Sequence, residues 1–250
     1  MHPGEDNFIS CGMDNTVCFW DLSARNWTGR LHLRNAYLAA YDPSAVTFAV
    51  ASASCGSVLL YDVRNFDKAP FSTFDLVETC RNVDPPHFVM QGWTKLEFSN
   101  DGKSLLVGTR GAGHYVLDAF TGELKAYLRK PDGGTWRLAP GETVASVSAA
   151  SADGTSAQQQ GRSGVPTAES SGDCAFSLDG SYVLGGGFKK DVLVWDLSQA
   201  SLSSDESKVL APKYVLQDKR EAGVLAVNPR YNFFATADRD LVFWLPEQNL

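Results

Sequence analysis

The sequence predicts an all-β protein of the β-propeller class, built from several similar four-stranded units. The first observation is a repeated strand ending, in which a β-branched, aliphatic and aromatic run closes on an aspartate. The second is a turn containing Gly, Pro, Asp or Asn that precedes each ending. One such turn and one such ending recur about every 40–45 residues, the period of propeller blades. The endings lie at residues 17–21, 58–62, 114–118 and 192–196, with a partial copy at 241–244.

The strands of each unit follow from short β-branched and aromatic runs separated by Gly, Asp, Asn and Pro. The first unit lacks its innermost strand, and the last unit stops before its outermost strand. We predict one domain over residues 1–250, with units at residues 1–33 (partial), 37–74, 94–128, 173–216 and 223–246 (partial).

Residues 146–172 depart from this pattern. They read SVSAASADGTSAQQQGRSGVPTAESSG, without an aromatic residue and with few aliphatic ones. Such a segment cannot bury enough apolar surface to offset its ordering entropy. We therefore expect a disordered insertion between the third and fourth units.

The charge, the apolar runs and the cysteine content of the chain limit which partners and which cellular compartment are expected. The net charge of −7 and the pI near 5.1 argue against a surface that neutralises phosphates, so no direct nucleic-acid partner is expected. No apolar run approaches the ~18 residues of a membrane span, so no membrane association is expected. The five cysteines include no Cys-x-x-Cys pair, which indicates a reduced, intracellular protein.

The residues of the repeated endings are predicted to be structural. The tryptophans should pack between neighbouring sheets, and the aspartates should bind the backbone of tight turns. These repeat positions are Trp20, Asp21, Tyr61, Asp62, Asp118, Trp195, Asp196 and Trp244, together with Asp14 in a turn of the first unit.

No catalytic constellation emerges from the sequence. Gly102-Lys103-Ser104 lacks the earlier glycine of a P-loop, and the four histidines have no His or Cys partner at metal-ligand spacing. An enzyme using a central channel would need a convergent polar cluster, which the sequence does not display. We predict no catalytic residue, no cofactor and no metal.

Particular stretches resemble one family, the WD40 subunit shared by COMPASS-type histone lysine methyltransferase complexes and, in fungi, the cleavage and polyadenylation factor. The most specific stretch is residues 61–74, YDVRNFDKAPFSTF; supporting stretches are 93–103 (WTKLEFSNDGK), 117–122 (LDAFTG) and 243–246 (FWLP). Members of this family form seven-bladed rings. The resemblance therefore implies a WD40 β-propeller with about five blades visible, from an N-terminally truncated seven-bladed ring.

The same resemblance implies a function. It implies a non-catalytic nuclear scaffold or adaptor of a histone lysine methyltransferase complex, an mRNA 3′-end processing complex, or both. Its partners would be protein subunits of those complexes, linked to RNA polymerase and transcription.

The alternative is a substrate receptor of a cullin-RING ubiquitin ligase. Such receptors carry Trp- or Tyr-Asp-x-Arg where a blade's third strand ends, as Tyr61-Asp62-Val63-Arg64 does here. Arg64 is then the candidate partner contact. The competing interpretation is that Arg64 only pairs with a nearby carboxylate.

Overall fold

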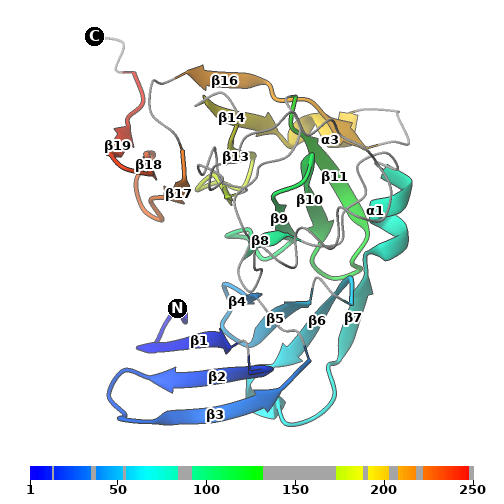
Figure 1. The fold of residues 1–250 in the computed structure, drawn as a ribbon, viewed down its shortest axis with the longest axis vertical. Helices are drawn as coiled ribbons and strands as arrows, with labels where there is room; N and C mark the ends of the chain where they lie inside the picture. Colours follow the sequence, from blue (N-terminus) through cyan, green and yellow to red (C-terminus); the bar gives the residue numbers. More distant parts are fainter. Residues whose placement is uncertain are drawn as a thin grey trace, which may run out of the picture.

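The computed structural model describes most of the chain as strands. The described residues are 1–12, 14–34, 38–52, 55–83, 92–131, 173–187, 191–202, 208–217 and 222–247. Over these residues five mainly antiparallel sheets follow one another around an arc (Figure 1). This arrangement confirms the predicted all-β propeller class. The expected insertion at residues 146–172 lies outside the described residues.

The first and second sheets lie side by side at the N-terminal end of the arc (Figure 1). The first sheet has the order β1 (Asn7–Gly12), β2 (Thr16–Asp21) and β3 (Trp27–His32). The second sheet has the order β4 (Leu38–Tyr41), β5 (Thr47–Ser52), β6 (Ser57–Asp62) and β7 (Ser72–Asp75).

The third and fourth sheets form the middle of the arc. The third contains β8 (Trp93–Phe98), β9 (Ser104–Thr109), β10 (Gly113–Asp118) and β11 (Leu124–Arg129). The fourth contains β12 (Cys174–Phe176), β13 (Tyr182–Gly186), β14 (Asp191–Asp196) and β16 (Tyr214–Gln217). The strand β15 (Val209–Leu210) lies within the fourth predicted unit, yet it pairs in parallel with β11 at the outer edge of the third sheet. A segment of one unit thus completes the neighbouring sheet.

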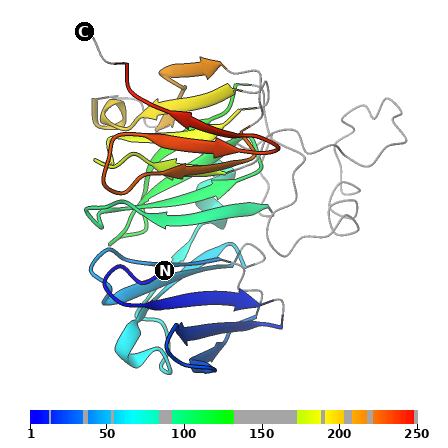
Figure 2. The same cartoon turned by 90° about the vertical axis from the view of Figure 1, so that its left-hand side faces the viewer.

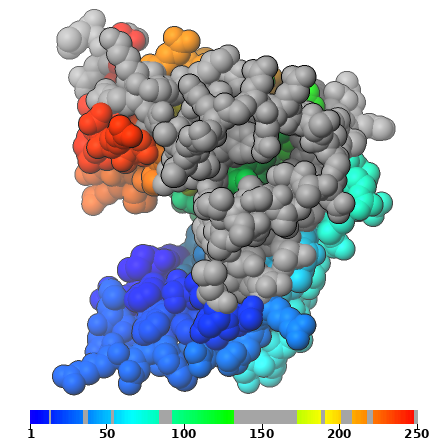
Figure 3. Space-filling model, viewed as in Figure 1, coloured from blue at the N-terminus to red at the C-terminus, as the bar shows by residue number. Residues whose placement is uncertain are grey.

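The fifth sheet closes the C-terminal end of the arc. It consists of β17 (Val224–Val227), β18 (Phe234–Ala237) and β19 (Leu241–Trp244). The side view groups the first two sheets at one end of the molecule and the other three at the opposite end (Figure 2). In the space-filling view an open notch separates the first sheet from the fifth (Figure 3).

Three short helical segments lie between strands within the described ranges, and the sequence analysis did not predict them. The 3-10 turn η1 (Val63–Asn65) follows β6, and the helix α1 (Val77–Val83) follows β7. The helix α3 (Ser198–Leu202) follows β14. The α1 helix is held by burial of Cys80, which packs in the same cluster as Leu76 and Trp93.

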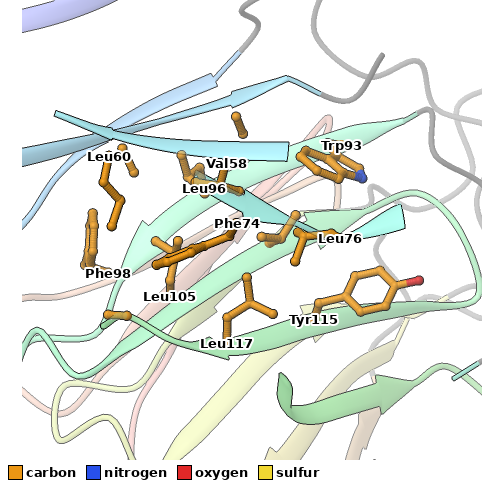
Figure 4. Packing of buried hydrophobic residues seen from close by; sticks show 14 of the residues in the cluster. Val58, Leu60, Phe74, Leu76, Trp93, Leu96, Phe98, Leu105, Tyr115 and Leu117 are labelled. Carbon is orange, nitrogen blue, oxygen red and sulfur yellow. The ribbon is translucent and has the colours of Figure 1, made fainter. Parts of the chain in front are cut away.

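The core lies between the faces of neighbouring sheets. Between the second and third sheets, Phe74 and Leu76 pack against Leu105, Leu117 and other side chains of the third sheet (Figure 4). Leu105 and Leu117 are fully buried. Burying one such side chain stabilises the fold by about 1.5–3 kcal/mol, so this interface holds the two sheets together.

The turns between the first two strands contain hydrogen bonds of the same type, though not at the same position of the turn. In the second to fifth sheets, a side-chain oxygen of Asp or Asn accepts the backbone N–H two residues later, a typical Asx arrangement. The donor–acceptor pairs are Ser44–Asp42 (3.0 Å), Lys103–Asp101 (3.0 Å), Ser181–Asp179 (3.1 Å) and Arg230–Asn228 (2.8 Å). Side chains close in sequence therefore hold these turns.

Candidate partner-binding surface

The aspartates that end the repeated strands all bind the chain that follows. Asp21, Asp62, Asp118 and Asp196 each accept the backbone N–H of the residue two positions later, at N···O distances of 2.7, 2.8, 2.9 and 2.9 Å. Each carboxylate thereby caps the turn into the next strand. In the first sheet, the Asp14 carboxylate similarly accepts the Thr16 hydroxyl at 2.6 Å.

These hydrogen bonds hold the carboxylates in the charged form. The Lys213 ammonium and the Ser198 hydroxyl lower the pKa of Asp196 to about 2. Backbone N–H groups of Thr121 and Phe120, with Lys125, lower the pKa of Asp118 to about 2 against the opposing effect of burial. A carboxylate with so low a pKa stays charged at neutral pH and is a poor proton donor, so these groups serve structure.

The aromatic repeat residues have different surroundings. Trp195 is fully buried, and its indole N–H donates to the Arg129 carbonyl of the third sheet at 3.2 Å. Tyr61 is buried and stacks on Phe48.

Trp20 and Trp244 are half-buried at the two ends of the arc. The Trp244 indole donates to the Thr236 hydroxyl at 2.9 Å, and its ring packs on the fourth sheet's core. The Trp20 indole donates to the Ser10 hydroxyl at 2.8 Å, and its ring stacks on Phe8. These four aromatic residues lie in four different sheets and form no common site.

Arg64 lies on η1, and its side chain is 74% exposed. Its guanidinium donates to both carboxylate oxygens of Asp62, at 3.1 Å from Nε and 2.8 Å from Nη2. The same bonds lower the pKa of Asp62 to about 2. Arg64 therefore pairs with a neighbouring carboxylate and still presents a cation to the surface.

A polar cluster at the innermost strands was missed by the sequence analysis. Lys95 and Glu97 of β8 lie beside Asp173, which precedes β12; the Lys95 ammonium is 3.6 Å from Asp173. Asp173 also accepts the backbone N–H of Leu225 in β17 at 2.8 Å. The cluster thus joins the inner strands of three sheets. No local spacing could reveal it, because its residues meet only through the fold.

Burial controls the protonation of Glu97. It raises the pKa of the Glu97 carboxyl to about 7; Lys95 opposes this shift and Asp173 adds to it. The carboxyl accepts the Phe176 backbone N–H, while its Oε2 is buried without a partner in the described structure.

A second buried network lies in the third sheet. His114 Nδ1 accepts the Thr109 backbone N–H at 3.0 Å, and the buried Lys130 ammonium donates to the Thr109 and Gly111 carbonyls at 2.7 and 3.0 Å. Burial, with the charge of Lys130, holds the pKa of His114 well below its usual value. A neutral histidine and a lysine occupied by carbonyls stabilise this end of the sheet.

The described residues offer no metal site and no membrane helix. Nowhere in the described ranges do three or more His, Cys, Asp or Glu side chains gather closely enough to hold a metal ion. Among the helices of the described segments, none has the length and apolar character needed to cross a membrane.

Comparisons with known proteins agree with the repeat pattern. Residues 1–21 match the family model "WD domain, G-beta repeat". The chain is 31% identical over 254 residues to an uncharacterized WD repeat-containing protein of Schizosaccharomyces pombe, covering 99% of this chain and 65% of the relative. It is 30% identical over 249 residues to WD repeat-containing protein 82 of Drosophila melanogaster, covering 98% of this chain and 62% of the relative.

A third relative carries a more specific name. COMPASS component SWD2 of Saccharomyces cerevisiae is 27% identical over 253 residues, covering 99% of this chain and 64% of the relative. The chain spans less than two thirds of the length of each of these three relatives. The resemblance noted in the sequence is thereby confirmed for the chain as a whole: it carries a WD40 repeat and is similar, over nearly all its residues, to WD-repeat proteins that include a COMPASS component.

Proposed function

We propose that this protein is a non-catalytic WD40 scaffold or adaptor subunit of a nuclear, COMPASS-type histone lysine methyltransferase complex. The observation that carries the proposal is the similarity of nearly the whole chain to COMPASS component SWD2. The partners we propose are protein subunits of that complex. We extend the proposal to the mRNA 3′-end processing machinery and, through it, to transcribing RNA polymerase.

The geometry supports an adaptor role. The strand-end aspartates are occupied by turns, and the buried His114 and Lys130 by neighbouring backbone groups. The sheets are arranged around an arc, and their exposed surfaces are available to other molecules (Figure 1). Surfaces built on rigid sheets suit the positioning of other proteins.

Affinity purification of the tagged chain from nuclear extract of its own cells tests this function. We expect subunits of a histone lysine methyltransferase complex to copurify. If the chain also belongs to the mRNA 3′-end processing machinery, polyadenylation-factor subunits should copurify as well. Recovery of neither set, while the tagged chain remains folded in the extract, contradicts the adaptor role.

A second candidate function rests on the exposure of Arg64. Its guanidinium is paired with Asp62 but remains 74% exposed, so it can also contact the adaptor of a cullin-RING ligase. Arg64→Ala and a control on the same loop, Lys68→Ala, distinguish the roles. If the chain is a ligase receptor, Arg64→Ala loses the ligase adaptor and Lys68→Ala retains it. Equal recovery with both variants contradicts the ligase role.

A further inference from the structure

A cavity of about 210 Å³ lies between the first and second sheets. Its wall includes the aromatic residues Phe19, Tyr41 and Phe66 together with His2. Glu5 contributes a carboxylate, and neither lysine nor arginine is among the described residues of the wall. The cavity is therefore bounded by rings and carries a negative charge.

The rings around this cavity contact one another in series. Phe66 stacks on Phe19 with centroids 4.4 Å apart, and Phe19 meets Phe48 edge-on at 5.1 Å. Phe48 meets Tyr41 at 6.5 Å, and Tyr41 meets His2 at 4.9 Å. The rings thus brace each other, which fixes their orientation before a ligand arrives.

Gly29 allows a further contact, between the Phe66 ring and the backbone of β3. A Cβ at this position would lie 2.6 Å from the Phe66 Cζ atom, so only glycine lets the Phe66 ring rest against β3. The close approach of the β3 backbone to the Phe66 ring therefore helps to shape the cavity wall, together with the rings themselves.

The carboxylate of Glu5 is held near the rings. It accepts the Asn7 side-chain amide at 2.8 Å, and both residues line the cavity. Burial and the nearby Glu5 charge raise the pKa of the Tyr41 hydroxyl, so the Glu5 charge acts on the Tyr41 side chain in the wall. Among the described lining residues, Glu5 is the one that carries a carboxylate.

We propose that this cavity binds a quaternary ammonium group, presented as a trimethyllysine side chain on a basic segment of a partner protein. Ring faces attract cations within about 6 Å of their centroids, and groups of rings suit methylated ammonium. An unmodified ammonium has three N–H donors that would lose water among rings, whereas a quaternary ammonium has none. The Glu5 carboxylate in the cavity wall and the net charge of −7 favour a basic peptide over a lipid surface.

Peptide titration against the full chain tests this binding activity, which does not depend on the proposed adaptor role. The probes are acetyl-Gly-Arg-Lys-Gly-amide, its trimethyllysine form, and a neutral isostere in which carbon replaces the quaternary nitrogen. We expect the trimethyllysine peptide to bind at least tenfold more tightly than either of the others. Equal affinity for the isostere means that apolar contact alone drives binding, and it overturns the proposal, as does equal affinity for the unmodified peptide.

Variants assign the binding to this cavity. Tyr41→Leu and Glu5→Gln should each weaken binding of the trimethyllysine peptide, Tyr41→Leu by at least tenfold, whereas Tyr41→Phe should retain it. Tyr214→Leu, which removes a half-exposed ring in the fourth sheet, is the matched control and should leave the affinity unchanged. If Tyr41→Leu fails to fold, Phe66→Leu takes its place. Unchanged affinity in a folded cavity variant overturns the proposal, as does preference for phosphatidylcholine vesicles over the trimethyllysine peptide.

Discussion

Ala45 and Gly102 occupy the same position in equivalent turns of the second and third sheets. Their φ angles are 61° and 69°, and each backbone N–H donates to a carbonyl three residues earlier at 2.8 Å, Asp42 for Ala45 and Ser99 for Gly102. A left-handed conformation costs an alanine roughly 1–2 kcal/mol, whereas glycine adopts it freely. The second sheet thus carries a strained alanine where the third carries the residue that fits.

Replacing Ala45 with glycine should stabilise the protein. Relief of the left-handed strain exceeds the extra entropy of glycine in the unfolded chain, so we expect a net gain of about 0.5 kcal/mol. The urea midpoint of unfolding at constant m-value measures it. Ala40→Gly, in the extended strand β4, is the control and should destabilise; a loss of stability in Ala45→Gly contradicts the argument.

Glu97 should make stability fall as the pH rises. Burial raises its pKa from 4.5 to about 7, so the folded protein favours the protonated carboxyl. The stabilisation that this provides is complete below pH 4.5 and is lost as the pH rises through 7. Glu97→Gln, which keeps the shape and the acceptor for Phe176, should remove this dependence and stabilise the protein at pH 8 by on the order of 2 kcal/mol.

Denaturant unfolding at pH 5.5 and pH 8 measures the effect of Glu97. Glu78→Gln, which removes an exposed carboxylate on α1, serves as control and should retain the wild-type pH dependence. Parallel pH profiles for the wild type and Glu97→Gln would show that Glu97 does not titrate in this range.

The interface between the second and third sheets should be sensitive to the loss of buried methyl groups. Leu105 is fully buried there, so Leu105→Ala removes buried methyl groups and leaves a cavity, at an expected cost of about 2–5 kcal/mol. Leu241 is 61% exposed, and Leu241→Ala should change stability by less than about 0.5 kcal/mol. The free energy of unfolding from urea titration compares the two; similar costs would place Leu105 outside the core.

Asp62 and Arg64 should differ in their effect on stability although they form one ion pair. Asp62→Ala removes the acceptor of the Arg64 backbone N–H and uncaps η1, whereas Arg64→Ala keeps that hydrogen bond. Thermal unfolding should therefore show a lower Tm for Asp62→Ala and little change for Arg64→Ala, because an exposed ion pair contributes little.

Acid sensitivity measures the interactions of the Asp62 carboxylate with the Arg64 side chain and with the Arg64 backbone N–H together. The pKa of Asp62 is lowered to about 2, so its contribution to stability is present above pH 3.8 and is lost as the pH falls toward 2. Asp62→Ala should lack this part of the acid dependence. An Arg64→Ala variant as unstable as Asp62→Ala would show that the ion pair, and not the cap, matters.

The sequence predicts the local part of the fold and misses the long-range part. Strand endings and turns are encoded by adjacent residues, as Asp62 and Asp101 show by binding backbone two positions away. The parallel pairing of β15 with β11 joins segments about eighty residues apart, and its two-residue strand carries no periodic signal. The helix α1 depends on burial of Cys80 against the neighbouring sheet, which no local pattern expresses.

The candidate site also has a part that the sequence predicts and a part that it does not. The pairing of Arg64 with a nearby carboxylate was one of two interpretations of a short motif, and the structure shows that bidentate pair with the guanidinium still exposed. The cluster of Lys95 and Asp173, and the cavity between the first two sheets, are made by residues distant in sequence. Such sites exist only once the sheets have packed.

The strand exchange at β15 has a kinetic consequence. The third sheet cannot open fully without releasing Val209 and Leu210, which the chain connects directly to β16 of the fourth sheet. The indole of Trp195 and the side chain of Asn100 add hydrogen bonds between the same two sheets, to Arg129 and Leu178. Amide protons of β10 and β14 should therefore exchange with solvent deuterium through one shared opening event, which makes these two sheets a single foldon at the centre of the arc.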